Sequence, residues 1–221
     1  MREVAVVGKI YAGKDRDGDF KWMVKQKQYS DALFLIAENF LDSLLEDAGA
    51  GGGTAVLRPK CPQRVAKGDT PRAVGVPTGW SLTASGFPQM DNYVKTVIDV
   101  SLDRIALVLD QHPQFKRLIY SCDAKAPNLL GVKIFEDTLN PSVREYISEQ
   151  IHDIANREPS PQTNTLKKIL KVEHKLLRVC LLITLNEEKA RKEKRAPAAR
   201  SGSRLMQPSL QTGSKRPFGS L

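Results

Sequence analysis

Short runs of β-branched and aliphatic residues alternate with longer amphipathic patterns in the first two thirds of this chain. Residues 3–13, 32–40 and 115–123 contain apolar runs with the length and composition of strands. Residues 90–113 and 140–159 instead place apolar side chains every three or four positions, as amphipathic helices do. This alternation predicts an α/β domain, with a mixed or parallel central sheet flanked by helices.

Each of the two predicted helices begins with residues that are typical N-caps. Asp91 or Asn92 can cap the first helix, and Asn140 can cap the second, with Pro141 at its first position. The secondary structure of two other segments is not decided by their sequence. Residues 20–31 fit a second strand or a short helix, and residues 40–49 fit a short helix or an ordered loop.

A cluster of glycines follows the strand predicted at residues 32–40. Glycine allows unusual backbone angles and lets a phosphate approach main-chain N–H groups. The segment lacks the GK[ST] sequence of a P-loop and the spacing GxGxxG. Two interpretations stay open: a cradle for a phosphate, or a tight loop in which glycine serves only the backbone geometry. The cluster consists of Gly49, Gly51, Gly52 and Gly53.

Polar residues beside these elements are candidates for ligand contact. Asn39 could hydrogen-bond an adenine, a ribose or an amide, and Glu38 could act as a base or accept from a ribose; alternatively, the pair caps the segment that follows. Arg58 could neutralise a phosphate or form a structural ion pair with a carboxylate. Gly131 belongs to a second loop, which precedes the predicted helix at residues 140–159.

The positive charge of the protein is concentrated near its C-terminus. The formal net charge is +9, and residues 187–221 hold nine lysines or arginines against three glutamates, which accounts for +6. We expect domain boundaries at 1–155 (α/β domain), 156–164 (linker), 165–195 (basic amphipathic helix) and 196–221 (disordered basic tail). The candidate nucleic-acid contacts are Lys189, Arg191, Lys192, Lys194 and Arg195.

Other features restrict the cellular setting. The three cysteines, Cys61, Cys122 and Cys180, are far apart and have no CxxC spacing, so neither a disulfide framework nor a metal site is expected. This favours an intracellular location, cytoplasmic or nuclear if the host cell has a nucleus. The longest apolar run near the C-terminus is too short for a membrane span, and no membrane partner is expected. The motifs call for no cofactor, and they leave the oligomeric state open.

Four short motifs in order, ALFLIAEN, GGGTAVLRP, AVGVPTG and LLGVKIF, resemble those of a largely uncharacterised family of bacterial, phage and viral proteins. That family's pattern has Asp-Asn after a strand, then GGxAxxR and G(I/V)PT. The resemblance covers residues 32–154. Glu38 stands where the family has Asp, and Thr54 stands where Asn or Gln is common.

The same pattern is more remotely similar to the macro domain, which binds ADP-ribose. By that resemblance Asn39 lies near the distal ribose and the glycines at positions 51–53 line the first phosphate loop. Gly131 and Phe135 line the second loop, in which Lys133 replaces a glycine and either supplies charge to a pyrophosphate or blocks the pocket.

Two functions therefore stand side by side. The first is a macro-like module that binds ADP-ribose or a related phosphate-bearing nucleotide, with hydrolysis of an ADP-ribosyl bond left open. The second is a non-enzymatic interaction or nucleic-acid-associated protein that acts through its basic C-terminal helix and tail. The sequence does not decide whether the protein is an enzyme.

Overall fold

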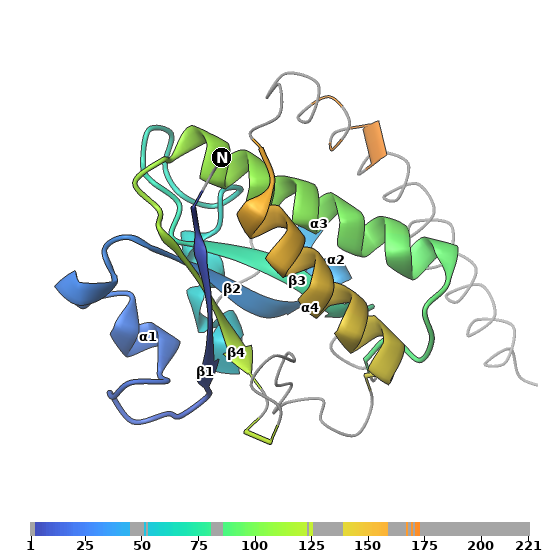
Figure 1. Cartoon of the computed structure of the whole chain (residues 1–221), viewed down its shortest axis with the longest axis horizontal. Coiled ribbons are helices and arrows are strands. Elements are labelled where there is room, and N and C mark those ends of the chain that lie inside the picture. The colour runs from blue at the N-terminus through green and yellow to red at the C-terminus, as the bar shows by residue number, and fades with distance from the viewer. Residues whose placement is uncertain are drawn as a thin grey trace, which may run out of the picture. The chain divides into compact units, whose positions relative to one another are not determined.

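Four parallel strands form the central sheet of a computed structural model, in the order β1-β4-β2-β3 (Figure 1). The strands are β1 (Ala5–Ile10), β2 (Ala32–Asn39), β3 (Ala73–Gly79) and β4 (Arg117–Cys122). The predicted α/β class is confirmed, and of the two sheet types expected, the parallel one is present. The structure describes residues 3–44, 51, 53–80, 86–122, 124–125, 139–158, 167, 169 and 171–172. All of them belong to the first of two compact units, Met1–Leu181 and Leu182–Leu221.

Helices connect and cover these strands. The described helical elements are α1 (Phe20–Met23), the 3-10 helix η1 (Lys27–Tyr29), α2 (Phe40–Leu44), the 3-10 helix η2 (Gly53–Lys60), α3 (Asn92–Gln111) and α4 (Pro141–Asn156). The segment at residues 20–31 thus contains two short helical elements, α1 and η1, and no strand, and residues 40–44 form a short helix. Pro59 lies inside η2, near its end, where the φ of a proline suits a 3-10 helix.

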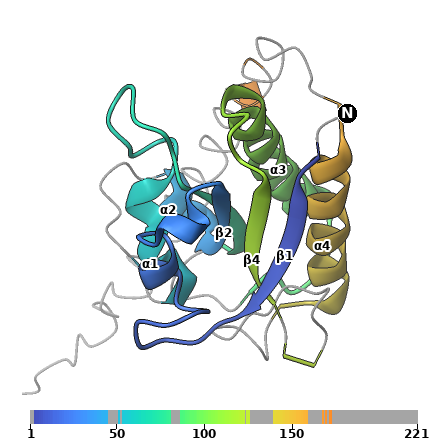
Figure 2. The same ribbon diagram turned by 60° about the vertical axis from the view of Figure 1, so that its left-hand side comes forward.

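The sheet is covered on both faces. Leu33, Leu35 and Val74 point to the face covered by α3 and α4, where the larger apolar core lies. Phe34 and Ile36 alternate to the other face, where they pack with residues of α1 and η2. Figure 2 shows α3 and α4 along one side of β1 and β4, with α1 on the other side. Burial on both faces explains why β2 is a continuous apolar run.

The two long helices begin where their caps predict. The Asp91 carboxylate accepts hydrogen bonds from the backbone N–H groups of Tyr93 and Val94, each at 2.8 Å. The Asn140 side-chain oxygen accepts from Ser142 N at 2.9 Å, and Pro141 occupies the first helical position. Both caps therefore satisfy N–H groups that have no partner inside their helix.

Candidate ligand-binding site

The strands β2 and β4 separate before either of them ends. Their pairing stops at Leu35 and Tyr120, whereas β2 continues beside β3 as far as Asn39, and β4 continues beside β1 as far as Cys122. After β2 the chain passes through the short helix α2 to η2, and η2 packs on the face that α1 covers. The described helix that follows β4 is α4, which packs on the opposite face. We call this place the β2–β4 junction. In parallel sheets, ligands bind outside the carboxyl ends of strands at such a change of direction.

Thr54 brings the start of η2 to this junction. The N–H of Phe34 donates toward the β3 side, to the carbonyl of Arg72, so the N–H of Ala37 faces the β4 side by strand alternation. It donates to Thr54 Oγ1 at 3.1 Å, in place of a β4 carbonyl. Gly53, directly before Thr54, has a φ of +58°, a conformation that glycine adopts without strain. The described glycines at the start of η2 are thereby held at the carboxyl edge of the sheet.

Two buried polar atoms at the same edge lack hydrogen-bond partners among the described residues. They are Asn39 Oδ1, at the end of β2, and Thr78 Oγ1, near the end of β3. Asn39 is 4% exposed and Thr78 is 1% exposed. Because an unsatisfied buried oxygen costs about 1 to 3 kcal/mol, these atoms are candidates for ligand contact.

Glu38 and Arg58, both predicted as ligand contacts, form a buried ion pair with each other. Arg58 Nε donates to Glu38 Oε1 at 2.6 Å, and Arg58 Nη2 donates to Asp42 Oδ2 at 3.0 Å. Arg64 adds a second cation, with Nη1 at 3.5 Å from Glu38 Oε1. The sequence left a phosphate contact or a structural ion pair as roles for Arg58, and in the structure Arg58 forms an ion pair with two carboxylates.

Burial governs the electrostatics of this cluster. Desolvation raises the pKa of Glu38 above its usual value, while the nearby guanidinium groups, that of Arg58 first, act in the opposite direction. Burial also raises the pKa of the neighbouring Cys61 thiol to about 12, so it stays protonated at neutral pH. Cys61 and Cys122 are both free and buried.

The carboxylate of Glu38 fits only because β3 carries a glycine beside it. A Cβ built on Gly75 would overlap with Glu38 Oε2. Gly75 lies opposite Ile36 in the sheet, two residues before Glu38. The absence of a side chain at position 75 therefore makes the space for a buried acid on β2.

The remaining predicted site residues are placed only in part. Gly51 lies against Arg58 and donates its N–H to the carbonyl of Ala55 at 3.1 Å. The residues that lie outside the described part of the chain, and stay predictions, are Gly52, Gly131, Lys133, Phe135, Lys189, Arg191, Lys192, Lys194 and Arg195.

The sequence analysis missed four residues of this edge: Asp42, Arg64, Gly75 and Thr78. None of these belongs to a spacing pattern that marks a site, and only the folded chain brings them to this edge.

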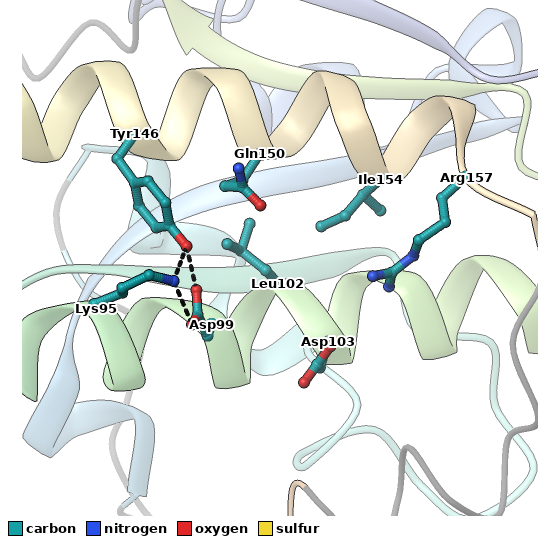
Figure 3. Close-up of a pocket in the computed structure, with 8 residues that line it drawn as sticks. All are labelled: Lys95, Asp99, Leu102, Asp103, Tyr146, Gln150, Ile154 and Arg157. Atoms are coloured by element: carbon teal, nitrogen blue, oxygen red, sulfur yellow. Dashed lines mark hydrogen bonds and ion pairs between the residues drawn. The ribbon is translucent and has the colours of Figure 1, made fainter. Parts of the chain in front are cut away.

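A hollow of about 190 Å³ lies between α3 and α4. Lys95 Nζ is 2.8 Å from Asp99 Oδ2 and 2.6 Å from Tyr146 Oη, and Tyr146 Oη donates to Asp99 Oδ1 at 2.5 Å. Figure 3 shows Tyr146 reaching from α4 toward Lys95 and Asp99 on α3. Lys95 is exposed and Asp99 and Tyr146 are half-buried. Because the three groups bond to one another, we interpret the hollow as a polar contact zone between two helices.

Comparisons with family models, with curated proteins and with solved structures found no match for this chain. Among the residues that the structure describes, no helix is long and apolar enough to cross a membrane. The same residues contain no group of three or more His, Cys, Asp or Glu side chains placed to hold a metal ion.

Proposed function

We propose that this chain is a macro-like α/β module that binds ADP-ribose, or a related phosphate-bearing nucleotide, at the β2–β4 junction. The observation that carries the proposal is the contact between Thr54 and Ala37, which brings a glycine-rich segment to the point where two parallel strands separate. Backbone N–H groups at such a place suit an anion, because no side chain keeps the phosphate away from the main chain.

In this proposal each group at the junction makes one contact with the ligand. The backbone N–H of Gly53 contacts a phosphate, while that of Gly51 stays bonded to the Ala55 carbonyl and closes the turn. Asn39 Oδ1 accepts a hydrogen bond from a ribose hydroxyl or an adenine amino group. Thr78 Oγ1 offers a second polar contact nearby. By the resemblance to macro domains, Gly131, Lys133 and Phe135 belong to a loop on the other side of the ligand.

We propose binding without a catalytic step. Glu38 is the acid nearest to Asn39 in the sequence, but its carboxylate is 2% exposed and is engaged by Arg58. Asp42 is engaged by the same guanidinium. A carboxylate held in this way is a poor general base, since a base must reach the proton that it removes. Hydrolysis is therefore no part of the proposal.

Calorimetric titration with ADP-ribose tests the proposed function. We expect wild-type protein to bind it, and Asn39→Ala to weaken binding at least tenfold. The same substitution should change the free energy of unfolding by no more than about 1 kcal/mol, because it removes an acceptor that has no partner in the free protein.

Asn156→Ala is the matched control, since Asn156 is exposed at the end of α4 and should leave affinity unchanged. Wild-type protein that binds no ADP-ribose or ADP at millimolar concentration would show the proposed function to be wrong. Full affinity in Asn39→Ala would instead remove Asn39 from the site.

A further inference from the structure

We propose that Arg58 is a positioning residue: its guanidinium ties the end of β2, the helix α2 and Gly51 together and so sets the position of the glycine segment. The positional effect does not depend on a ligand. Its consequence for affinity rests on the function proposed above.

The guanidinium reaches two elements through two different nitrogen atoms. Nε donates to Glu38 on β2 and Nη2 donates to Asp42 on α2, at 2.6 and 3.0 Å. The Arg58 side chain is 6% exposed, and the Glu38 side chain is 2% exposed. Hydrogen bonds between charged groups that are this well shielded from water are stronger than surface ion pairs, and losing one partner is costly.

Gly51 packs directly on this guanidinium. A Cβ at position 51 would lie 3.4 Å from Arg58 Nη2, 3.6 Å from Nη1 and 2.8 Å from Ala55 Cβ. Since real Cβ atoms do not approach another side chain to 2.8 Å, only glycine fits here without a shift. The hydrogen bond from Gly51 N to the Ala55 carbonyl closes the same turn. The position of Gly51 is therefore coupled to that of Arg58.

Arg64 strengthens the attachment of α2. Its Nη2 donates to the backbone carbonyl of Asp42 at 2.6 Å, while the Asp42 carboxylate accepts from Arg58. Asp42 is thus held through both its main chain and its side chain. Arg58 and Arg64, which follow the glycine segment in the chain, are thus both bonded to Asp42, which precedes it.

Lysine cannot replace arginine in this arrangement. The planar guanidinium offers Nε and Nη2 in a fixed fork, so one side chain contacts two carboxylates in defined directions. A lysine at position 58 keeps the charge but has a single nitrogen at its tip. Arg58→Lys therefore separates the geometric role from the charge.

Native-state hydrogen–deuterium exchange of the full chain without ligand tests the positional effect. In Arg58→Lys we expect amide exchange in peptides covering residues 51–57 to rise at least tenfold more than in peptides covering β4. Arg72→Lys is the control. Arg72, like Arg58, donates two hydrogen bonds from its guanidinium, but its acceptors are the backbone carbonyls of Ala32 and Tyr29. This variant should show no such local increase.

Equal increases in both regions of Arg58→Lys, or no increase in either, would overturn the positioning role. If Arg58→Lys does not fold, Asp42→Asn supplies the test, because it weakens only one of the two carboxylate contacts. The same local increase is expected in that variant, and its absence would overturn the proposal equally.

Titrations with ADP-ribose and with adenosine then connect position to binding. Adenosine lacks the phosphates, so a displaced glycine segment should lower the affinity for ADP-ribose about tenfold and that for adenosine less than twofold. Equal affinities of wild type and Arg58→Lys for ADP-ribose would overturn the link to binding. Wild-type protein that binds neither compound, with the local exchange effect present, would refute the proposed function and leave the positioning role standing.

Discussion

The burial of Glu38 depends on a missing side chain on the neighbouring strand. Gly75 provides the space that Glu38 Oε2 occupies, and Arg58 and Arg64 compensate the charge from the other side. A buried carboxylate is stable only while its partners stay in place, because leaving either charge unpaired inside a protein costs several kcal/mol. At the scale of single residues, a side chain at position 75 would therefore disturb this buried ion pair.

We expect Gly75→Ala to lower the free energy of unfolding by about 3 kcal/mol, since the added methyl group displaces Glu38 from Arg58. Urea denaturation of purified protein measures the loss. Gly13→Ala is the control, because a Cβ at position 13 meets nothing within 4 Å. That variant should be neutral or slightly more stable. Equal stability of Gly75→Ala and wild type would contradict the buried position of Glu38.

At the scale of elements, a second ion pair joins the beginnings of two adjacent strands. Arg117, the first residue of β4, donates from Nε to both carboxylate oxygens of Asp31, each at 3.1 Å. It also donates to the carbonyl of Gln28 and lies over the ring of Tyr29. The hydrogen bond from Arg117 is the main cause that lowers the pKa of Asp31 below 3.8. This contact fixes the amino ends of β2 and β4, whose carboxyl ends separate.

The lowered pKa of Asp31 gives stability a defined pH dependence. The Asp31 carboxylate contributes its full share to the stability of the fold above pH 3.8, which is its pKa in the unfolded chain. This contribution is lost as the pH falls through the lower pKa of the folded state. The stability difference between wild type and Asp31→Asn should therefore shrink as the pH is lowered from 6 to 2, as followed by urea denaturation. Asp69→Asn, at an exposed position, should parallel wild type throughout. A difference that is constant with pH would argue against the ion pair.

At the scale of the whole molecule, a segment beyond the α/β core packs on the outer side of α3. Ile169 is 3% exposed and contacts Val100 and Leu107, with Val172 at the margin of the cluster. Ile169 belongs to the segment at residues 165–195 that was expected to form a basic amphipathic helix. The boundaries drawn for the basic helix and tail stay predictions.

Ile169→Ala should lower the free energy of unfolding by about 2 to 4 kcal/mol, because it leaves a cavity against α3. Chemical denaturation measures the change, and Lys167→Ala, at an exposed position two residues earlier, is the control. An unchanged stability in Ile169→Ala would mean that this segment contributes nothing to the folded unit in solution.

Local patterns in the sequence were enough for the α/β class, for three of the four described strands and for the two long helices, because periodicity acts over a few residues. They also gave the cap at Asn140 and, as one of two candidates, the cap at Asp91. The sequence also indicated which strand end carries polar residues, at Glu38 and Asn39. It did not distinguish a phosphate contact from an ion pair at Arg58, since the partner acids lie 16 and 20 positions away. Only the tertiary structure decided the order of the strands and the separation of β2 from β4. It alone also decided the burial of Glu38 against Gly75 and the hydrogen bond between Thr54 and Ala37. Each of them depends on contacts between segments distant in the chain, which no local pattern encodes.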